Sequence, residues 1–176
     1  AAVRMHDWYL AVISGERRTA GATVARVFFH LLAWPFALLA RLRYQAYRLG
    51  LAPVRHLPDT KINSVGNIIA GGTGKTPLVL LLVLALQGRG LKIGIAARGY
   101  GGVRTSGPAL VSDGKQVRLT AREAGDEPFL LMKELAGVPV AVDQSKAAAA
   151  ELLARECRPA VIIVDDGFQH LALARD

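Results

Sequence analysis

The feature that most constrains this chain is a glycine-rich segment between two apolar runs. It reads GGTGKT over residues 71–76. The run before it, INSVGNII at 62–69, is rich in apolar and β-branched residues, which predicts a strand. The run after it, KTPLVLLLVLALQGRG at 75–90, is rich in leucine and ends in glycine, which predicts a helix. A strand, a glycine turn and a helix in this order indicate an α/β sheet.

The glycine turn is predicted to bind phosphate. Its glycines allow backbone N–H groups to curve around an anion, and the positive end of the following helix favours negative charge. Lys75 can reach the β- and γ-phosphates of a nucleotide, and the Thr76 hydroxyl can bind Mg²⁺. The usual G-x-x-x-x-G-K-[ST] pattern fails at one position, which Ile69 occupies. The residues expected to hold the nucleotide are Gly71, Gly72, Thr73, Gly74, Lys75 and Thr76.

A phosphate-binding turn of this type needs a second, acidic element, and AVIIVDDGFQH at 160–170 supplies it. Asp165 follows an apolar run that predicts a buried strand, and ligands of parallel sheets bind at such strand ends. We expect Asp165 to hold Mg²⁺, directly or through water, and Asp166 to act beside it. Alternatively, Asp166 belongs to a plain turn with the next glycine. Gln169 and His170 are weaker candidates for substrate binding.

Two other short segments carry candidate residues. AGDEP places Asp126 and Glu127 at the start of a predicted helix, where an acidic residue also suits a simple N-terminal cap. AARGYGG at 96–102 follows a predicted strand. Its Arg98 can meet a phosphate and its Tyr100 can line a cleft, although an ordinary connecting loop would have a similar composition.

The rest of residues 59–176 alternates between strand and helix patterns, which predicts a parallel sheet with helices on both faces. Strands are expected at 92–97, 138–142 and 160–164, helices at 126–137 and 144–157, and a hairpin at 109–120 about the turn at Asp113. The helix at 75–90 is apolar nearly all round, so we expect it to be buried.

An amphipathic helix is predicted at 23–51, before the α/β part. One face is apolar, whereas Arg26, His30, Arg41 and Arg48 share the other. This pattern favours a helix lying in the interface of a membrane, with docking on the protein core as the alternative. A spanning helix would have to bury Arg26 and His30. Residues 50–59 resemble a linker, so the expected domains are 1–58 and 59–176.

The net charge of +8 is compatible with nucleic acid, an anionic membrane or phosphorylated ligands. Nucleic acid is disfavoured, because much of the basic excess lies on a helix whose other face is apolar and no aromatic-basic platform occurs. A single cysteine, Cys157, cannot form an internal disulfide.

Together, SVGNIIAGGTGKTP, ARGYGG, GDEPFLL and VIIVDDGFQHLALARD, in this order after an apolar-basic helix, closely resemble the tetraacyldisaccharide 4'-kinase family of lipid A biosynthesis. The resemblance implies a P-loop NTPase-like fold. It also implies Mg²⁺-dependent transfer of the ATP γ-phosphate to the 4'-hydroxyl of a tetraacylated disaccharide 1-phosphate. The expected location is the cytoplasmic face of the bacterial inner membrane, with peripheral attachment through residues 23–50.

By position in these motifs, the resemblance implies that Asp126 is the base that accepts the proton of the acceptor hydroxyl. Lys75 and Thr76 would hold the phosphates and Mg²⁺. Asp165 and Asp166 would hold the metal and assist the phosphoryl transfer. Members of the family are nearly twice as long, so we expect this chain to be their N-terminal portion, without the C-terminal domain. The competing interpretation is a P-loop ATPase switch or partner-binding module, whose hydrolysis would respond to a protein partner and ignore lipid.

Overall fold

The computed structural model describes residues 8, 10–16, 19–66, 74–103, 107–168 and 170–176. The chain divides into two compact units, Ala1–Leu51 and Ala52–Asp176. Each unit is described by itself. The domain boundary predicted after residue 58 stays a prediction.

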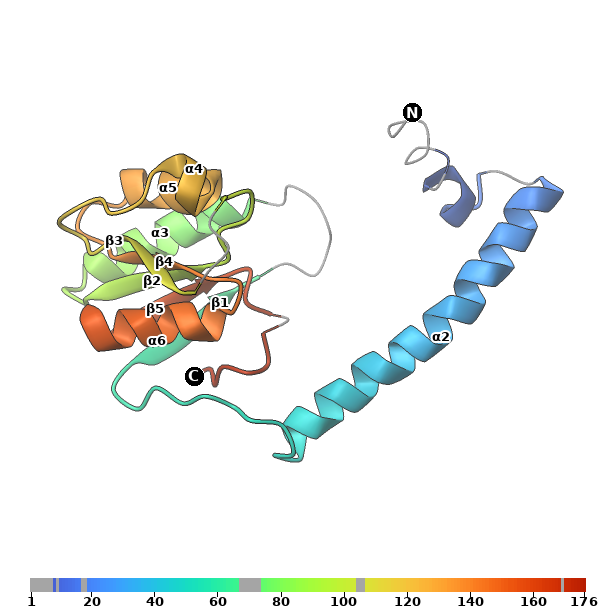
Figure 1. Ribbon diagram of the computed structural model, residues 1–176, viewed down its shortest axis with the longest axis horizontal. Coiled ribbons are helices and arrows are strands. Elements are labelled where there is room, and N and C mark those ends of the chain that lie inside the picture. The colour runs from blue at the N-terminus through green and yellow to red at the C-terminus, as the bar shows by residue number, and fades with distance from the viewer. Residues whose placement is uncertain (1–7, 9, 17–18, 67–73, 104–106, 169) are drawn as a thin grey trace. The chain divides into compact units, whose positions relative to one another are not determined.

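The first unit is dominated by the long helix α2, Ala20–Arg48 (Figure 1). Thr19 caps its start, because the threonine side chain accepts a hydrogen bond from the Ala22 N–H at 3.3 Å. The helix continues through Pro35. Ala22 is its buried residue, whereas Trp34 and Phe36 are about three-quarters exposed, at 76% and 75%. By length and composition alone, α2 is long and apolar enough to cross a membrane.

The second unit is built on a five-stranded sheet with the order β1-β5-β2-β4-β3. The strands are β1 (Lys61–Val65), β2 (Ile93–Ala97), β3 (Ala109–Ser112), β4 (Val140–Val142) and β5 (Val161–Asp165). The first four in spatial order are parallel, so their carboxyl ends lie at one edge of the sheet. The strand that carries the glycine turn, β1, is therefore the direct neighbour of β5, which ends at Asp165.

Helices cover both faces of this sheet, as predicted (Figure 1). They are α3 (Lys75–Gln87), α4 (Ala121–Ala124), α5 (Asp126–Glu134) and α6 (Lys146–Glu156). The side chains of β2 show the two faces: Ile95 packs in one core cluster with Val79 of α3 and Leu131 of α5, whereas Ala96 packs in a second cluster with Leu153 of α6. Alternation along the strand thus divides the core into two layers.

The predicted hairpin at 109–120 forms only in part. β3 pairs antiparallel with β4, which makes the sheet mixed, and Ser112 forms an isolated bridge with Val117 instead of starting a second strand. The Asp113 carboxylate accepts hydrogen bonds from the N–H groups of Lys115 and Gln116, both at 2.8 Å. The Asp113 side chain thus binds backbone N–H groups that a second strand would have paired in a ladder of hydrogen bonds.

The prediction that α3 is buried is wrong. Only Val79 and Val83 of its 13 residues are buried. Leu78, Leu81 and Leu84 are 54%, 67% and 53% exposed. The reason is geometric, because a helix that lies on a sheet needs only one stripe for packing and its other side remains outward.

The predicted linker is attached to the second unit at Arg55. Its N–H donates to Ala172 O at 2.8 Å, its carbonyl accepts from the Ala174 N–H at 2.9 Å, and its guanidinium pairs with Glu151. The end of the described chain then reaches β1, where the Ile62 N–H donates to the Asp176 carboxylate at 2.8 Å. These contacts hold both ends of the unit against the sheet.

Candidate active site

The phosphate end of the site is the start of α3. Gly74 precedes the helix in the left-handed conformation, with φ of 74°, and no side chain caps the helix. The first turn of α3 contains no acidic residue, so the partial positive charge of the helix start is available to a ligand. The predicted contacts of Gly71, Gly72 and Thr73 lie outside the described residues.

Lys75 and Asp166 form an ion pair across this end of the sheet, with 3.0 Å between Nζ and Oδ1. The hydrogen bond to Asp166 raises the pKa of Lys75, and the same bond lowers the pKa of Asp166. Both side chains are accessible, at 28% and 59% exposed. The first residue of α3 is thus brought to the end of β5, as the two motifs predicted.

Asp165, the last residue of β5 and the neighbour of Asp166 in the chain, is buried, at 5% exposed. Burial, followed by the repulsion of Glu127, raises its pKa to about 6. Its Oδ1 atom and the Ser64 hydroxyl of β1 are buried and lack a hydrogen-bond partner among the described residues. In the register of β1 and β5, Asp165 shares the α3 face of the sheet with Val65, whereas Ser64 shares the α6 face with Val164. The Asp165 oxygen alone of the two therefore faces the start of α3, where a carboxylate suits Mg²⁺ that completes its shell with phosphate and water.

Gly167 brings these two strand ends together. A Cβ atom at this position would lie 2.3 Å from the Ser64 hydroxyl oxygen and 2.7 Å from Cγ1 of Val164. A side chain at 167 would therefore push the loop after β5 away from β1. The closeness of Ser64 to the acidic loop was not predicted from the sequence.

The starts of α3 and α5 are joined by a side-chain hydrogen bond. Thr76 Oγ1 donates to Glu127 Oε1 at 2.9 Å. Glu127, a weaker candidate for substrate binding from the AGDEP segment, thus lies beside the residue predicted to bind Mg²⁺. Asp126, the first residue of α5, is exposed at the same edge of the sheet.

The loops that carry Tyr100 and Asp126 are packed backbone to backbone. A Cβ at Gly102 would lie 2.4 Å from the Glu123 carbonyl oxygen, and a Cβ at Gly125 would lie 2.4 Å from the Tyr100 carbonyl oxygen. The contact needs glycine on each side, and Gly125 also has a positive φ of 91°. The glycines of ARGYGG and AGDEP therefore allow the two loops to interlock.

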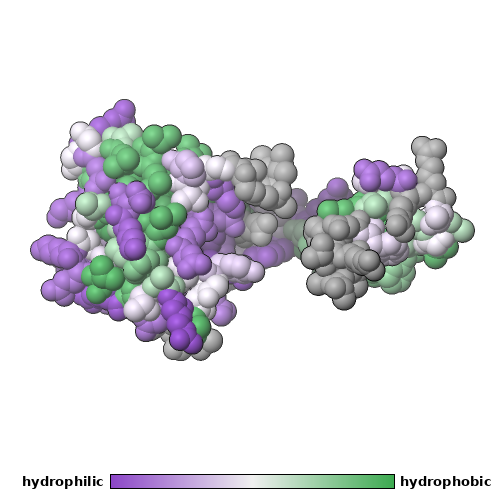
Figure 2. All heavy atoms as spheres, turned by 90° about the horizontal axis from the view of Figure 1, so that it is seen from above, coloured by the Kyte–Doolittle hydropathy of each residue, from purple (hydrophilic) through white to green (hydrophobic). Residues whose placement is uncertain are grey.

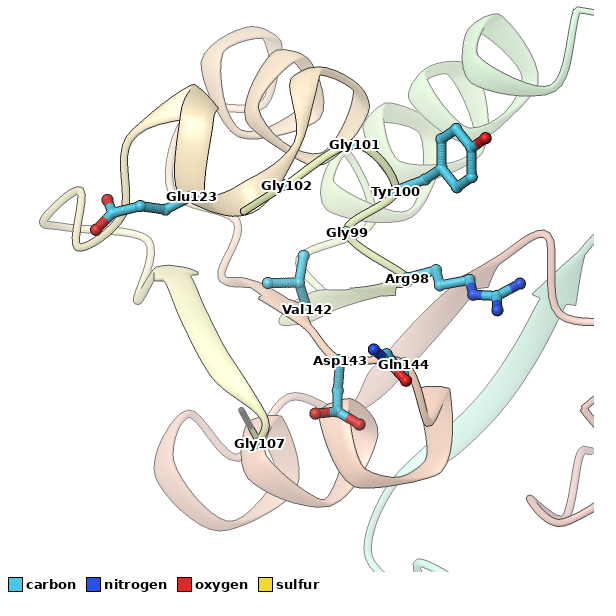
Figure 3. A pocket seen from close by; sticks show the side chains of 10 residues that line it. All are labelled: Arg98, Gly99, Tyr100, Gly101, Gly102, Gly107, Glu123, Val142, Asp143 and Gln144. Carbon is cyan, nitrogen blue, oxygen red and sulfur yellow. The ribbon is translucent and has the colours of Figure 1, made fainter. Parts of the chain in front are cut away.

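A cavity of about 340 Å³ opens beside these loops. Its lining comes from the loop after β2, from Glu123 of α4 and from the end of β4 (Figure 3). Figure 3 shows the side chains of Arg98 and Tyr100 leaving the loop on one side, whereas Glu123 points the opposite way. Tyr100 is 86% exposed, so its ring is free to meet a ligand. Arg98 and Tyr100, the two candidate residues of this loop, thus line the same cavity.

Lys146 is a site residue that sequence reasoning missed. It is the first residue of α6, is only 2% exposed, and donates from Nζ to the main-chain oxygen of Asp166. Burial lowers its pKa. A clue was present in the sequence, because a lysine at the start of a helix opposes the helix dipole and needs a compensating partner. That partner is the acidic loop after β5.

His170 lies near the acidic loop, since its charge contributes to the lowered pKa of Asp166. Its N–H donates to the Gly167 carbonyl at 3.0 Å. Gln169 lies outside the described residues. The site therefore brings together most of the predicted residues at one edge of the sheet.

Comparison with known proteins agrees with the motifs. Residues 25–176 match the family model of the tetraacyldisaccharide-1-P 4'-kinases. A tetraacyldisaccharide 4'-kinase of Geobacter sulfurreducens is 42% identical over 163 residues, which are 93% of this chain and 46% of the relative. One of Tolumonas auensis is 48% identical over 80% of this chain and 41% of the relative. The chain thus spans about half the length of the curated relatives it matches.

A solved structure is similar as well. It is an "apo" form of LpxK from Aquifex aeolicus in complex with ATP, 34% identical, with a TM-score of 0.71. The match covers 81% of this chain and 45% of that one. It confirms the predicted P-loop α/β fold. Sequence, fold and site geometry agree, and the chain belongs to the tetraacyldisaccharide-1-P 4'-kinase family.

Proposed function

We propose that this chain is the nucleotide-binding half of an ATP-dependent kinase that phosphorylates the 4'-hydroxyl of tetraacyldisaccharide 1-phosphate. The observation that carries the proposal is the meeting of Lys75, Asp165 and Asp166 at the open start of α3. The ion pair of Lys75 with Asp166, beside the buried Oδ1 atom of Asp165 that lacks a partner among the described residues, suits a magnesium–nucleotide complex. Family membership supports the reaction type.

In this proposal, the start of α3 and Lys75 hold the phosphates of ATP. Lys75 is already oriented by Asp166, and a bound phosphate would compete for the same ammonium group. Thr76 and Asp165 would hold Mg²⁺, which supplies charge neutralisation when it is bound. A cation beside Asp165 would oppose the effect of burial on its pKa, because it would compensate the buried negative charge.

Asp126 is the proposed base for the acceptor hydroxyl. It lies at the start of α5, next to Glu127, which is hydrogen-bonded to Thr76. The acceptor side is therefore connected to the metal side through two consecutive residues of α5. Arg98 and Tyr100 would contact the acceptor in the cavity beside the loop, with Arg98 suited to an anionic group.

The substrate is a membrane lipid in this proposal, so the enzyme must reach a bilayer. The exposed apolar residues of α2 support association with a membrane. That the attachment is peripheral and at the cytoplasmic face of the inner membrane is part of the proposal and rests on the family resemblance. Gln169 and His170 remain proposed substrate contacts, and no role in nucleic-acid binding is proposed.

The test is transfer of labelled γ-phosphate from Mg-ATP to tetraacyldisaccharide 1-phosphate in detergent micelles. We expect lipid labelling that Lys75→Ala abolishes. Asp126→Asn, placed in this chain and in a relative of full length, should lower turnover by orders of magnitude and leave nucleotide affinity within about threefold.

Two results would contradict the proposal. Unchanged Mg-ATP affinity in Lys75→Ala would remove the phosphate assignment. Hydrolysis of ATP that ignores the lipid and rises with an added protein partner would favour an ATPase switch instead.

A further inference from the structure

Phe168, in the acidic loop after β5, lies against the residue at which the chain leaves β1. A Cβ atom at Gly66 would lie 2.6 Å from Cγ of the Phe168 ring and 2.9 Å from both of its Cδ atoms. These ring atoms are the three nearest heavy atoms outside the residues that adjoin Gly66. The ring is therefore seated on the glycine backbone, and a residue with a side chain at 66 would displace it.

Gly66 stands between the sheet and the turn that is proposed to bind phosphate. It follows the last residue of β1, and the glycine turn at 71–76 comes shortly after it in the chain. At its other end, the turn passes through Gly74 into α3, which is packed on the sheet. The segment that carries the turn thus has two anchored ends, α3 and Gly66, and the ring of Phe168 covers the second of them.

The contact with Gly66 is one of several between the end of β1 and the acidic loop. The Gly167 N–H donates to the Val65 carbonyl at 3.1 Å, and Gly167 leaves no room for a side chain beside Ser64. Ser64 and Val65 thus meet Gly167, and Gly66 meets Phe168. Contacts at successive residues hold the loop and the strand end in one arrangement, so a shift of either would be transmitted to the other.

The exposure of the ring is not the reason to single it out. Phe168 is 44% exposed, and Figure 2 shows that other hydrophobic residues also reach the surface of the second unit. Single exposed apolar side chains are normal on folded proteins. Phe168 differs from the others by its place, because it joins the loop of Asp165 and Asp166 to the segment that is proposed to hold the phosphates.

We propose that Phe168 is a positioning residue of the phosphate site, which acts through Gly66 and does not itself contact the nucleotide. Its ring sets the direction in which the chain leaves β1, so that the glycine turn and Asp165 keep a fixed relation to each other. The positioning role rests on the proposed Mg-ATP site. The packing of the ring on Gly66 does not depend on it.

Stacking of the adenine base on the exposed side of the ring is the competing role. The two roles differ in the ligands that respond to a change at 168. A ring that acts through the turn affects every phosphate chain that the turn binds, whereas a ring that stacks on a base affects only ligands with a base. Mg-tripolyphosphate, which has no base, distinguishes the two roles.

The first experiment is calorimetric titration of the whole chain with Mg-ATP and with Mg-tripolyphosphate, at a temperature at which every variant is folded. Phe168→Ala should weaken the binding of both ligands by about tenfold and by the same factor, because the turn loses the support of one anchored end. Weakening of Mg-ATP alone would overturn the proposal in favour of base stacking. Unchanged affinity for both ligands would overturn it as well.

The matched control is Leu110→Ala. Leu110 is buried on β3, at the opposite edge of the sheet from β1. Its truncation should lower the thermal stability, as a cavity in the core does, and leave both affinities within about twofold. If Leu110→Ala weakens binding as much as Phe168→Ala does, loss of stability explains both results and the positioning role is wrong.

The second experiment asks whether the ring acts through Gly66. Gly66→Ala alone should weaken both ligands by about tenfold or more, because its Cβ displaces the ring. In the Phe168→Ala background the same change should cost less than about threefold, because the three atoms nearest to that Cβ are gone. Effects that multiply in the double variant would show that the two residues act independently, which would contradict the proposal.

A third measurement needs no ligand. Hydrogen exchange of the Gly167 amide, which is bonded to the Val65 carbonyl, should be at least about tenfold faster in Phe168→Ala, while exchange at Ile163 of β5 follows global stability. Unchanged exchange at Gly167 would contradict the packing on Gly66. An unaltered chain that binds neither ligand would overturn the Mg-ATP site and the positioning role together. Binding that responds as expected, without lipid phosphorylation, would count against the kinase assignment alone.

Discussion

Helices α3 and α6 lie on opposite faces of the same sheet, and each begins with a lysine that reaches Asp166. Lys75 contacts the carboxylate and is accessible, and its pKa is raised. Lys146 contacts the main-chain oxygen and is buried, and its pKa is lowered. The same residue at the same helical position thus performs two tasks. An accessible lysine can transfer its hydrogen bonds to a ligand, whereas a buried lysine holds the loop.

The two helices differ along their lengths as well. α6 buries six of its 11 residues, Lys146 among them, and exposes Arg155 and Glu156, whereas α3 buries two of 13 although it is almost wholly apolar. Apolar composition therefore does not measure burial in this molecule. The difference teaches that α6 is fitted to the core along most of its length, whereas α3 packs by one stripe and leaves leucines exposed.

The largest expected effect is a difference in stability between truncating a leucine in α6 and truncating one in α3. Leu153→Ala in α6 should lower the free energy of unfolding by about 2–5 kcal/mol, because the fully buried side chain leaves a cavity. Leu81→Ala in α3 should change it by less than about 0.5 kcal/mol. Denaturant unfolding measures both. Similar losses would mean that the outer side of α3 is covered in the folded chain.

The next effect distinguishes Lys75 from Lys146, because one substitution should change nucleotide affinity and the other should change stability. Lys75→Met should weaken Mg-ATP binding by about 10- to 100-fold and leave stability nearly unchanged, because an accessible charged hydrogen bond to the ligand is lost. Lys146→Met should lower stability by about 1–3 kcal/mol, since the hydrogen bond from the buried lysine to the Asp166 carbonyl is lost. Calorimetric titration and thermal unfolding of both variants check this, with Lys146→Arg as a partial rescue. A reversed pattern would show that the assigned roles are exchanged.

The smallest effect concerns Asp165, the carboxylate beside these lysines. Its folded-state pKa of about 6 lies above the ordinary value of 3.8, so the folded protein loses stability as the pH rises through 6. Without Mg²⁺, Asp165→Asn should therefore raise the free energy of unfolding by about 2 kcal/mol at pH 7.5, with the difference disappearing below about pH 4. Thermal unfolding across pH measures it. A variant less stable at pH 7.5 would show that the carboxylate is satisfied when it is ionised.

The sequence predicted the parts of the site that depend on local geometry. Lys75 follows a glycine turn and Asp165 ends an apolar strand, so their positions at the sheet edge follow from their own segments. Ser64 and Lys146 were missed, because they reach the acidic loop only through the strand order β1-β5-β2-β4. The hydrophobic pattern of a single segment does not indicate the order of the strands in the sheet. The exposure of α3 was missed because an apolar helix gives no signal of which side is covered.

The interlocked loops of the acceptor side have a consequence for how such a site can change during evolution. Gly102 and Gly125 each face a carbonyl oxygen of the other loop, so the backbone there accepts neither a larger residue nor an inserted one without separating the pair. The side chains at 98, 100 and 126 point outward from this fixed frame and can be exchanged one at a time. New acceptor preferences would then arise by substitution within a loop of constant length, and length variation would be confined to the outer connections of the sheet.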